Sequence, residues 1–191
     1  MSIIFIILAY LIGSLSSATI VSRLFNLPDP RSQGSQNAGA TNVLRLSGRK
    51  PAAIVLCADA LKALLPVWFA QLLGVTDMAL AWVALAAVLG HIFPVFFHFK
   101  GGKGVAPALG GFFGLNMLLC LIAILIWVSI AKLTRYSSLA SIAAITLSIL
   151  TSPLYINRYY LVPLIIMNIF ILIKHWSNIV RLIEGRESKI G

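Results

Sequence analysis

The stretch Gly34-Ser-Gln-Asn-Ala-Gly-Ala-Thr-Asn-Val-Leu-Arg45 is a polar interruption in a chain of which 60% of the residues are hydrophobic. Gly34 and Gly39 free the backbone, and Arg45 adds a permanent positive charge. Four neutral side chains supply hydrogen-bond donors and acceptors: Ser35, Asn37, Thr41 and Asn42. Because long apolar runs flank the stretch on both sides, we expect it to form a polar pocket at a membrane surface that binds an anion.

The composition is that of an integral membrane protein. Charged residues make up only 10% of the 191 residues, against about 25% in soluble domains. The simplest organisation is one membrane domain over residues 1–191. The net charge of +10 fits cytoplasmic loops rich in Lys and Arg that meet anionic headgroups. Spacings typical of nucleic-acid-binding modules are missing from the sequence, so we expect no nucleic-acid partner.

Five apolar segments predict membrane-spanning helices, and all but the last approach the roughly 20 residues that a span requires. They cover residues 3–21, 51–73, 78–99, 136–156 and 159–173.

Residues 105–131 are uncharged, and two interpretations of them are open. One tilted span fits their length. Two crossings fit the charge, because the next loop carries Lys132 and Arg135, which the positive-inside rule assigns to the cytoplasm. We favour two crossings, the first by a short helix near residues 105–116. The residues suited to the turn are Gly110, Gly111, Gly114 and Asn116.

The expected fold class is therefore all-α, a polytopic bundle of seven transmembrane helices with the N-terminus outside and the C-terminus in the cytoplasm. Every Lys and Arg except Lys62 and Arg158 then falls on the cytoplasmic side. Three polar segments share that side: residues 34–45, 100–104 and 175–187. Their common location predicts a reaction or binding site that faces the cytoplasm.

Asp59 and Lys62 lie three residues apart inside the second expected span, on one helical face. Charges within spans normally face the protein interior and pair with one another. Two roles are open for them: a neutralised pair that holds helices together, or a part of the pocket lining. The acidic residues form no cluster of the kind that binds a divalent metal. Cys57 and Cys120 are expected to be packing residues.

The segment Gly101-Gly102-Lys103-Gly104 has the parts of a phosphate cradle. Glycines let backbone N–H groups approach an anion, and lysine adds charge. The segment is not a Walker A motif, and a flexible loop between helices is the alternative interpretation. His175 and Asn178 are three residues apart on one helical face, where the amide can orient the imidazole or bind substrate beside it. An interfacial or capping role of His175 is the alternative.

Together these segments resemble the bacterial acyl-phosphate:glycerol-3-phosphate acyltransferase family, PlsY. The resemblance runs almost the full length of the chain, in the order expected for the family. The matching segments are Gly34 to Arg45, Gly90 to Pro94, Phe99 to Ala106, Thr134 to Tyr136 with Ser138 and Leu139, His175 to Leu182, and Gly185 to Glu187.

The resemblance implies a seven-helix membrane enzyme of the bacterial cytoplasmic membrane, with its active site facing the cytoplasm. It implies transfer of a fatty acyl chain from acyl phosphate to the sn-1 hydroxyl of glycerol 3-phosphate, which gives lysophosphatidate and phosphate, the first step of bacterial phospholipid synthesis. No cofactor or metal is expected, and a monomer is expected to function. Because the mixed anhydride is already activated, positioning and charge stabilisation can supply the catalysis.

On this interpretation five residues are catalytic: Ser35, Arg45, Lys103, His175 and Asn178. Arg45 and Lys103 hold phosphate, and Ser35 donates to the reacting group. His175 takes the hydroxyl proton, or the departing phosphate takes it while His175 and Asn178 orient the substrate. The expected substrate-binding residues are Gly34, Asn37, Gly39, Thr41, Asn42, Gly101, Gly102, Gly104, Ser138 and Glu187.

The sequence departs from the family pattern at Gln36, where the family usually has glycine, at Ala63, also usually glycine, and at Pro107, usually threonine. Two other functional classes are compatible with a helical bundle of this size. A small transporter of anionic phosphorylated solutes would use similar residues, but transporters usually place binding polarity near the bilayer midplane. A scaffold protein would not need three polar segments on one side.

Overall fold

The computed structural model describes residues 2–190, and the regular structure within this range is entirely helical. The α-helices are α1 (Ser2–Gly13), α2 (Ser17–Leu24), α3 (Ala40–Ser47), α4 (Arg49–Leu72), α5 (Asp77–Ile92), α6 (Val105–Leu115), α7 (Met117–Thr134), α8 (Ser137–Thr151), α9 (Leu161–Lys174) and α10 (Trp176–Ile183). Short 3₁₀ turns are η1 (Val95–Phe97), η2 (Ser152–Leu154) and η3 (Arg158–Tyr160).

The expected all-α, polytopic membrane fold is confirmed, with four to six candidate spans in the described range. Four helices are long and apolar enough to cross a membrane: α4, α5 extended by η1, α7, and α8 extended by η2. Two more spans result if the bent pairs α1–α2 and α9–α10 each count as one, with bends of 41° and 58°. Helix α6 has 11 residues, so its length of about 16 Å is roughly half of the hydrocarbon thickness.

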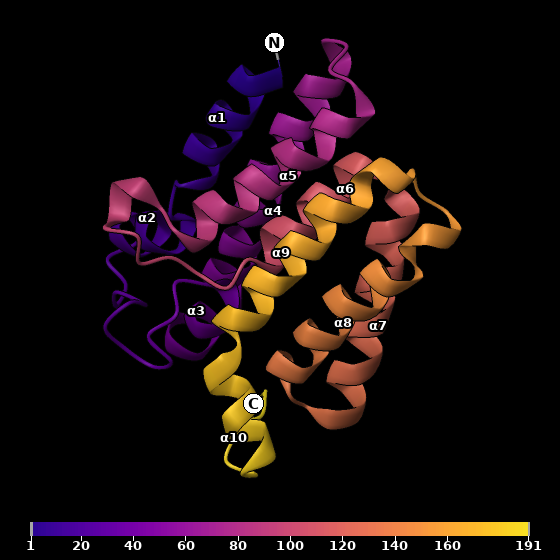
Figure 1. The fold of residues 1–191 in the computed structure, drawn as a ribbon. Coiled ribbons are helices and arrows are strands. Elements are labelled where there is room, and N and C mark those ends of the chain that lie inside the picture. Colours follow the sequence, from indigo (N-terminus) through magenta and orange to yellow (C-terminus); the bar gives the residue numbers. More distant parts are fainter. Residues whose placement is uncertain (1, 191) are drawn as a thin grey trace.

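Helix α5 is the centre of the bundle. It packs against α1, α4, α6 and α9, and most of its side chains are buried. The α7–α8 hairpin completes the bundle through contacts of α7 with α6 and of α8 with α9. In Figure 1 the N-terminus lies at the top, and α10 with the C-terminus lies at the bottom. The outer faces of the helices remain apolar and exposed, as lipid contact requires.

Glycines allow the closest helix contacts, in the manner of small-residue interfaces between membrane helices. A Cβ atom added at Gly13 would overlap the carbonyl group of Ala87, and one added at Gly90 would overlap the carbonyl oxygen of Tyr10, so α1 and α5 touch backbone to backbone. Gly110 of α6 lies in the same way against the carbonyl group of Ala60 in α4.

The observed helices differ from the expected segments in three places. Residues 40–47 form helix α3, whereas none of the helices expected from the sequence covers the polar stretch 34–45. The first span is interrupted between Gly13 and Ser17. The break between α6 and α7 lies at Asn116, whose side chain accepts a hydrogen bond from the Leu119 N–H and so caps α7. The glycines expected in that turn instead lie within α6, because their small size is needed for helix packing.

Candidate active site

A cavity of about 1110 Å³ opens among α3, the glycine loop 100–104, the start of α8, and α10 with the C-terminal tail. The three polar segments that the sequence singled out therefore converge in space. Every residue expected in the site lines this cavity except Gly102. Gly102 instead lies behind the cavity wall, against the imidazole ring of His91.

Asn42 holds the first polar segment in shape. Its Nδ2 donates to the carbonyl oxygens of Pro30 at 2.8 Å and Gln33 at 3.0 Å, and its Oδ1 accepts from the Ser35 N–H at 2.9 Å. The side chain is 1% exposed. These bonds fix the backbone at Ser35, which lines the cavity.

Gln36 occupies a backbone conformation that favours glycine. Its φ of 56° lies in the left-handed region, which costs a residue with a side chain about 1–2 kcal/mol. The hydrogen bonds of Asn42 hold the neighbouring residue Ser35 in place and so stabilise this unfavourable backbone conformation of Gln36.

The glycine loop presents Lys103 to the cavity. The Gly102 N–H donates to the carbonyl oxygen of His91 at 3.1 Å. Gly104 has a φ of 88°, and a Cβ there would press on the side chains of Ile92 and Val88. The ammonium of Lys103 donates a hydrogen bond to Oδ1 of Asn178 on α10.

Burial lowers the pKa of Lys103 to about 8, against the opposing attraction of the Glu187 carboxylate. The positive charges of Arg181, Arg45 and Lys174 lower this pKa further. Several cations thus crowd one end of the cavity, where Glu187 is the acidic residue that neutralises them. An anion entering this end gains favourable contacts with each of them.

Glu187 ties the C-terminal tail to the site. Its Oε1 accepts from Oγ of Ser138 at 2.9 Å and from Nδ2 of Asn178 at 2.7 Å, and its Oε2 accepts from Nε of Arg181 at 2.7 Å. Burial opposes ionisation of Glu187, but these hydrogen bonds from Asn178, Arg181 and Ser138 outweigh it and lower the pKa. Glu187 is therefore an ionised anchor for the groups around it.

His175 lies at the bend between α9 and α10. Its Nδ1 is 2.8 Å from the carbonyl oxygen of Ile171, and the side chain is 3% exposed. A carbonyl oxygen only accepts, so Nδ1 carries the proton, and the neutral ring keeps a lone pair on Nε2. The imidazole can therefore accept a proton from a substrate in the cavity.

Asn178 does not orient His175 directly, because its side chain bonds to Lys103 and Glu187. Sequence reasoning gave no role to Arg181, which also lines the cavity. The spacing could have found it, since His175, Asn178 and Arg181 follow one another at intervals of three residues and share one side of a helix.

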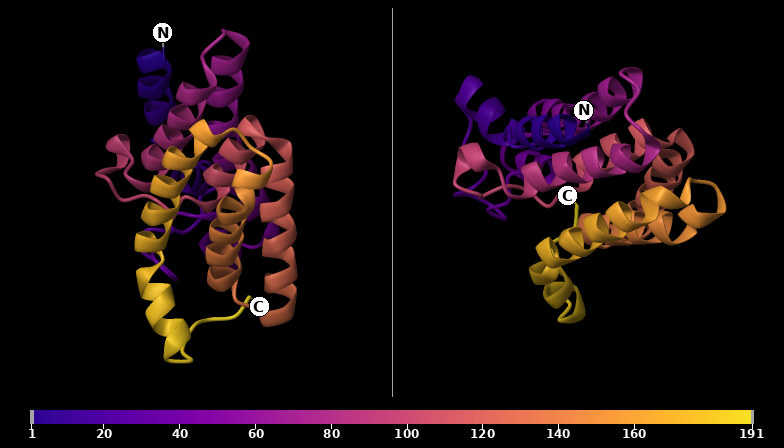
Figure 2. Two further views of the ribbon diagram at one scale, coloured as in Figure 1. Left: turned by 45° about the vertical axis from the view of Figure 1, so that its right-hand side comes forward. Right: turned by 45° about the horizontal axis from the view of Figure 1, so that its top comes forward.

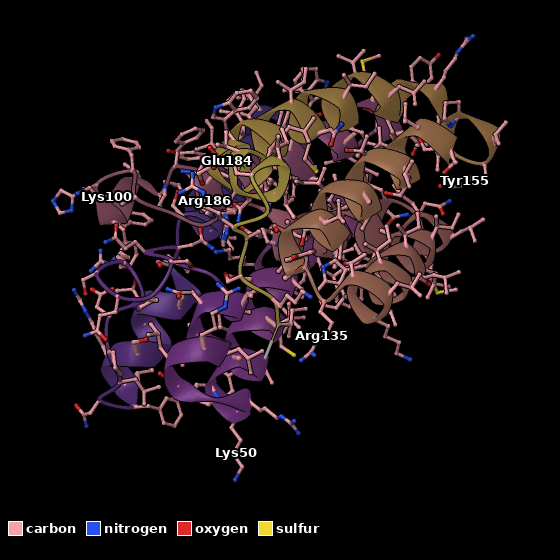
Figure 3. All side chains as sticks on the ribbon, turned by 90° about the horizontal axis from the view of Figure 1, so that it is seen from below. Lys50, Lys100, Arg135, Tyr155, Glu184 and Arg186 are labelled. Atoms are coloured by element: carbon pink, nitrogen blue, oxygen red, sulfur yellow. The ribbon has the colours of Figure 1, made fainter. Side chains whose placement is uncertain are left out.

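The C-terminal tail crosses the polar end of the cavity. Figure 2 (left) shows it running from α10 toward the α7–α8 hairpin, and Figure 3 shows Glu184 and Arg186 beside α10, where the tail begins. The Ile190 N–H donates to the Arg135 carbonyl oxygen at 2.7 Å, and Arg45 donates to the Ser188 carbonyl oxygen at 3.4 Å. The tail therefore links the first and third polar segments.

Apart from its cationic part, the cavity is lined largely by apolar side chains of α4, α6 and α7. This apolar part suits a hydrocarbon chain, while the cationic part suits a phosphate group. The apolar lining includes Leu56, Ala60, Leu64, Leu109, Phe113, Ile124 and Trp127. Within residues 2–190, His, Cys, Asp and Glu side chains form no group of three or more that could hold a metal ion.

Comparison with known proteins connects this chain with one enzyme family. The sequence profile of the family described as glycerol-3-phosphate acyltransferase matches residues 3–185. The glycerol-3-phosphate acyltransferase of Pseudoalteromonas translucida (strain TAC 125) is 50% identical over 188 residues, which cover 97% of this chain and 91% of that protein. The glycerol-3-phosphate acyltransferase of Francisella tularensis subsp. holarctica (strain FTNF002-00 / FTA) is 51% identical over 190 residues, with the same coverage.

The fold is also that of a solved integral membrane glycerol 3-phosphate acyltransferase, PlsY. Its glycerol 3-phosphate form has a TM-score of 0.94 and 39% sequence identity, covering 100% of this chain and 96% of that one. Its lysophosphatidic acid form has a TM-score of 0.92 and 38% identity, covering 100% and 95%. These matches confirm the resemblance seen in the sequence motifs. The chain belongs to the PlsY family of integral membrane glycerol-3-phosphate acyltransferases.

Proposed function

We propose that this glycerol-3-phosphate acyltransferase takes its acyl chain from an acyl phosphate and transfers it to the sn-1 hydroxyl of glycerol 3-phosphate. The products are lysophosphatidate and inorganic phosphate. The observation that carries the proposal is the cavity, which joins a cationic part to an apolar part. The donor has a phosphate and a hydrocarbon chain, the acceptor has a phosphate, and the cavity offers a matching surface to each.

Arg45, Lys103 and Arg181 hold the two phosphate groups in this proposal. The hydroxyl oxygen of glycerol 3-phosphate attacks the acyl carbonyl carbon, a new ester C–O bond forms, and the C–O bond to the phosphate breaks. Ser35 donates a hydrogen bond to the reacting acyl phosphate group, where negative charge develops. The anhydride is activated before it binds, so the residues of the site need only position and stabilise the reacting groups.

Two groups can accept the proton of the attacking hydroxyl. Nε2 of His175 has a free lone pair in the neutral ring, which supports a general-base role. The departing phosphate is the alternative acceptor. Replacement by alanine separates the two, because loss of an essential base lowers kcat by about 10²–10⁴-fold. Near-normal kcat in His175→Ala would assign the proton to the phosphate.

The topology that we propose has seven crossings, with α6 as a short one, an external N-terminus and a cytoplasmic C-terminus. Contacts between loops support one sidedness. Asn157 donates to Asp77 at 3.1 Å, which joins two turns that we assign to the outside. On the opposite side, Oγ1 of Thr41 and Oγ of Ser137 lie 3.3 Å apart. The enzyme then resides in the bacterial cytoplasmic membrane as one domain over residues 1–191, active as a monomer, with its site facing the cytoplasm.

Purified protein incubated with acyl phosphate and glycerol 3-phosphate tests the activity. We expect equimolar release of phosphate and lysophosphatidate, and little product when acyl-CoA replaces acyl phosphate. Ser35→Ala should lower the rate at least tenfold, because it removes a donor to the reacting group. Uptake of labelled glycerol 3-phosphate into liposomes without acyl donor would instead support a transporter and contradict the proposal.

A further inference from the structure

Three titratable side chains meet inside the bundle beside the cavity. Nζ of Lys62 lies 2.8 Å from Oδ1 of Asp59 and 2.9 Å from Nδ1 of His91. It also donates to the carbonyl oxygen of Leu15, at 2.8 Å, in the break between α1 and α2. Asp59 is 1% exposed, and Lys62 and His91 are each 6% exposed. Asp59, Lys62 and His91 are called the buried triad below.

Lys62 determines which nitrogen of His91 carries the proton. An ammonium group has three N–H donors and no acceptor. Here the ammonium forms an ion pair with the Asp59 carboxylate, and its two hydrogen-bond partners are the Leu15 carbonyl oxygen and Nδ1 of His91. Nδ1 must therefore present its lone pair, and the neutral ring carries its proton on Nε2. Lys62 thus fixes both the tautomer and the orientation of the ring.

The ring and the backbone of His91 form the surface on which the glycine loop lies. The Gly102 N–H donates to the His91 carbonyl oxygen at 3.1 Å. A Cβ atom at Gly101 would overlap that oxygen, and a Cβ atom at Gly102 would overlap Nε2 of the ring. Glycine is required at both positions because the loop lies directly on His91, which makes the closest contacts. The carbonyl oxygens of Ile92 and Ala38 would lie 2.8 Å and 2.9 Å from the added Cβ atoms of Gly101 and Gly102. Lys103, which enters the cavity, is the next residue along the chain.

Stability alone is a weak explanation for the buried triad. Replacing a buried ion pair with apolar residues is often neutral or stabilising, and charges retained inside membrane helices commonly mark functional sites. Asp59 and His91 also line the same cavity as Lys103. The triad therefore connects α4, α5 and the glycine loop at the wall of the substrate site.

We propose that the buried triad is a positioning unit for the phosphate-binding loop. Lys62 orients the His91 ring, the ring sets the position of the Gly101–Gly102 backbone, and this backbone sets where the Lys103 ammonium meets a substrate phosphate. The inference rests on the proposed function, which assigns phosphate binding to Lys103. Its signature is a change in affinity for the phosphorylated substrate that depends on contact between His91 and Gly102.

A double-mutant cycle of Gly102→Ala and His91→Asn tests that contact. Gly102→Ala places a methyl group against the ring and should raise KM for glycerol 3-phosphate about tenfold, with a smaller change in kcat. His91→Asn removes the ring where the methyl group would lie. We therefore expect the double variant to have a lower KM than the product of the two single effects predicts. Additive effects in the cycle would overturn the proposal.

Lys62→Met tests the orienting role, since methionine keeps the length of the side chain but loses its three donors. We expect a raised KM and a kcat that changes less. The matched control is Thr146→Val, which removes an interhelical hydrogen bond to Asn168, 3.1 Å long, away from the glycine loop. This control should keep the wild-type KM. An unchanged KM in Lys62→Met, or an equal rise in the control, would overturn the orienting role.

If Lys62→Met does not fold, the cycle of Gly102→Ala and His91→Asn still decides, because both variants keep the Asp59–Lys62 ion pair. Wild-type assays separate this inference from the proposed function. A wild-type enzyme without acyl-phosphate-dependent activity would overturn both. An active wild-type enzyme with an additive cycle would overturn the inference alone.

Discussion

Lys103 lines the cavity of the proposed active site and has an altered pKa. Burial lowers its pKa to about 8, with further lowering by Arg181, Arg45 and Lys174 against the opposing Glu187 carboxylate. The free enzyme therefore keeps the charge below pH 8 and loses it as the pH rises through that value. Because burial has already removed much of the water around this ammonium group, the group loses little further hydration when it binds a phosphate. Its pKa of about 8 still keeps it charged at physiological pH.

This acidity predicts the alkaline limit of the reaction. The kcat/KM for glycerol 3-phosphate should be constant below pH 8 and fall about tenfold per pH unit above it, because kcat/KM reports groups of the free enzyme. The phosphate itself stays dianionic over this range, since its second pKa is about 6. Measurement of kcat/KM between pH 6.5 and about 9.5 checks the prediction.

Lys103→Arg is the matched control for that profile. Arginine stays charged far above this range, so the alkaline fall should disappear. The maximal rate should be lower, because a planar guanidinium does not replace an ammonium at a fitted site. An unchanged alkaline fall in Lys103→Arg would assign the titration to another group.

Replacement of Glu187 should change both the activity and the pKa of Lys103. Its carboxylate accepts from Ser138, Asn178 and Arg181, and its charge raises the pKa of Lys103. In Glu187→Gln we expect kcat/KM to fall roughly 10–100-fold, since a hydrogen bond to a charged group contributes about 1.5–3 kcal/mol. The alkaline fall should also move to lower pH. A lowered rate with an unmoved pH profile would contradict the electrostatic coupling.

At the level of the helix, α6 shows what the sequence could and could not predict. Its glycines were expected to form a turn, because glycine and asparagine are common in turns. The positive charges of Lys132 and Arg135 also favoured two crossings. Only Asn116 forms the turn, as the cap of α7. Gly110 serves packing, since it lies against the carbonyl group of Ala60, and a contact between distant residues leaves no local signal. Helix α3 escaped prediction for the converse reason, because its polar residues are typical of a loop.

Gly110→Ala should destabilise the α4–α6 contact. The new methyl group would overlap the Ala60 carbonyl group, and overpacking of this kind costs about 1–3 kcal/mol. We expect a lower thermal unfolding temperature in detergent and a lower activity, because α6 follows the glycine loop directly. Unfolding monitored by intrinsic fluorescence, together with the phosphate-release assay, checks both effects.

Gly111→Ala is the matched control on the same helix. Its Cβ atom would lie 3.1 Å from Cβ of Ala84, a tight contact with a side chain that small shifts can relieve. The unfolding temperature should therefore fall less than in Gly110→Ala. An equal fall in both variants would show that the backbone contact with Ala60 does not determine the response, because the higher helix propensity of alanine favours both variants alike.

Across the whole molecule, the sequence predicted the convergence of three polar segments from charge alone. If Lys and Arg collect on one side of the membrane, the segments that carry them must share that side. Charge cannot predict distances within this face, and so the bonds of Asn178 to Lys103 and Glu187 were missed. Nor could it predict the buried triad, because His91 of α5 meets Lys62 of α4 only in the folded bundle. In Figure 3 Lys50, Lys100 and Arg135 surround the end where the tail lies.

The proposed topology of seven crossings can be tested by cysteine labelling. In a background without Cys57 and Cys120, a membrane-impermeant thiol reagent applied to intact cells should label Arg158→Cys and Met117→Cys. Lys132→Cys, also exposed in the structure, should be labelled only after the membrane is opened. Met117 is the informative position, since it begins α7 and reaches the outside only if α6 completes a crossing. Labelling of Lys132→Cys in intact cells would contradict this topology, because residues 105–131 would then cross once and Lys132 would lie outside.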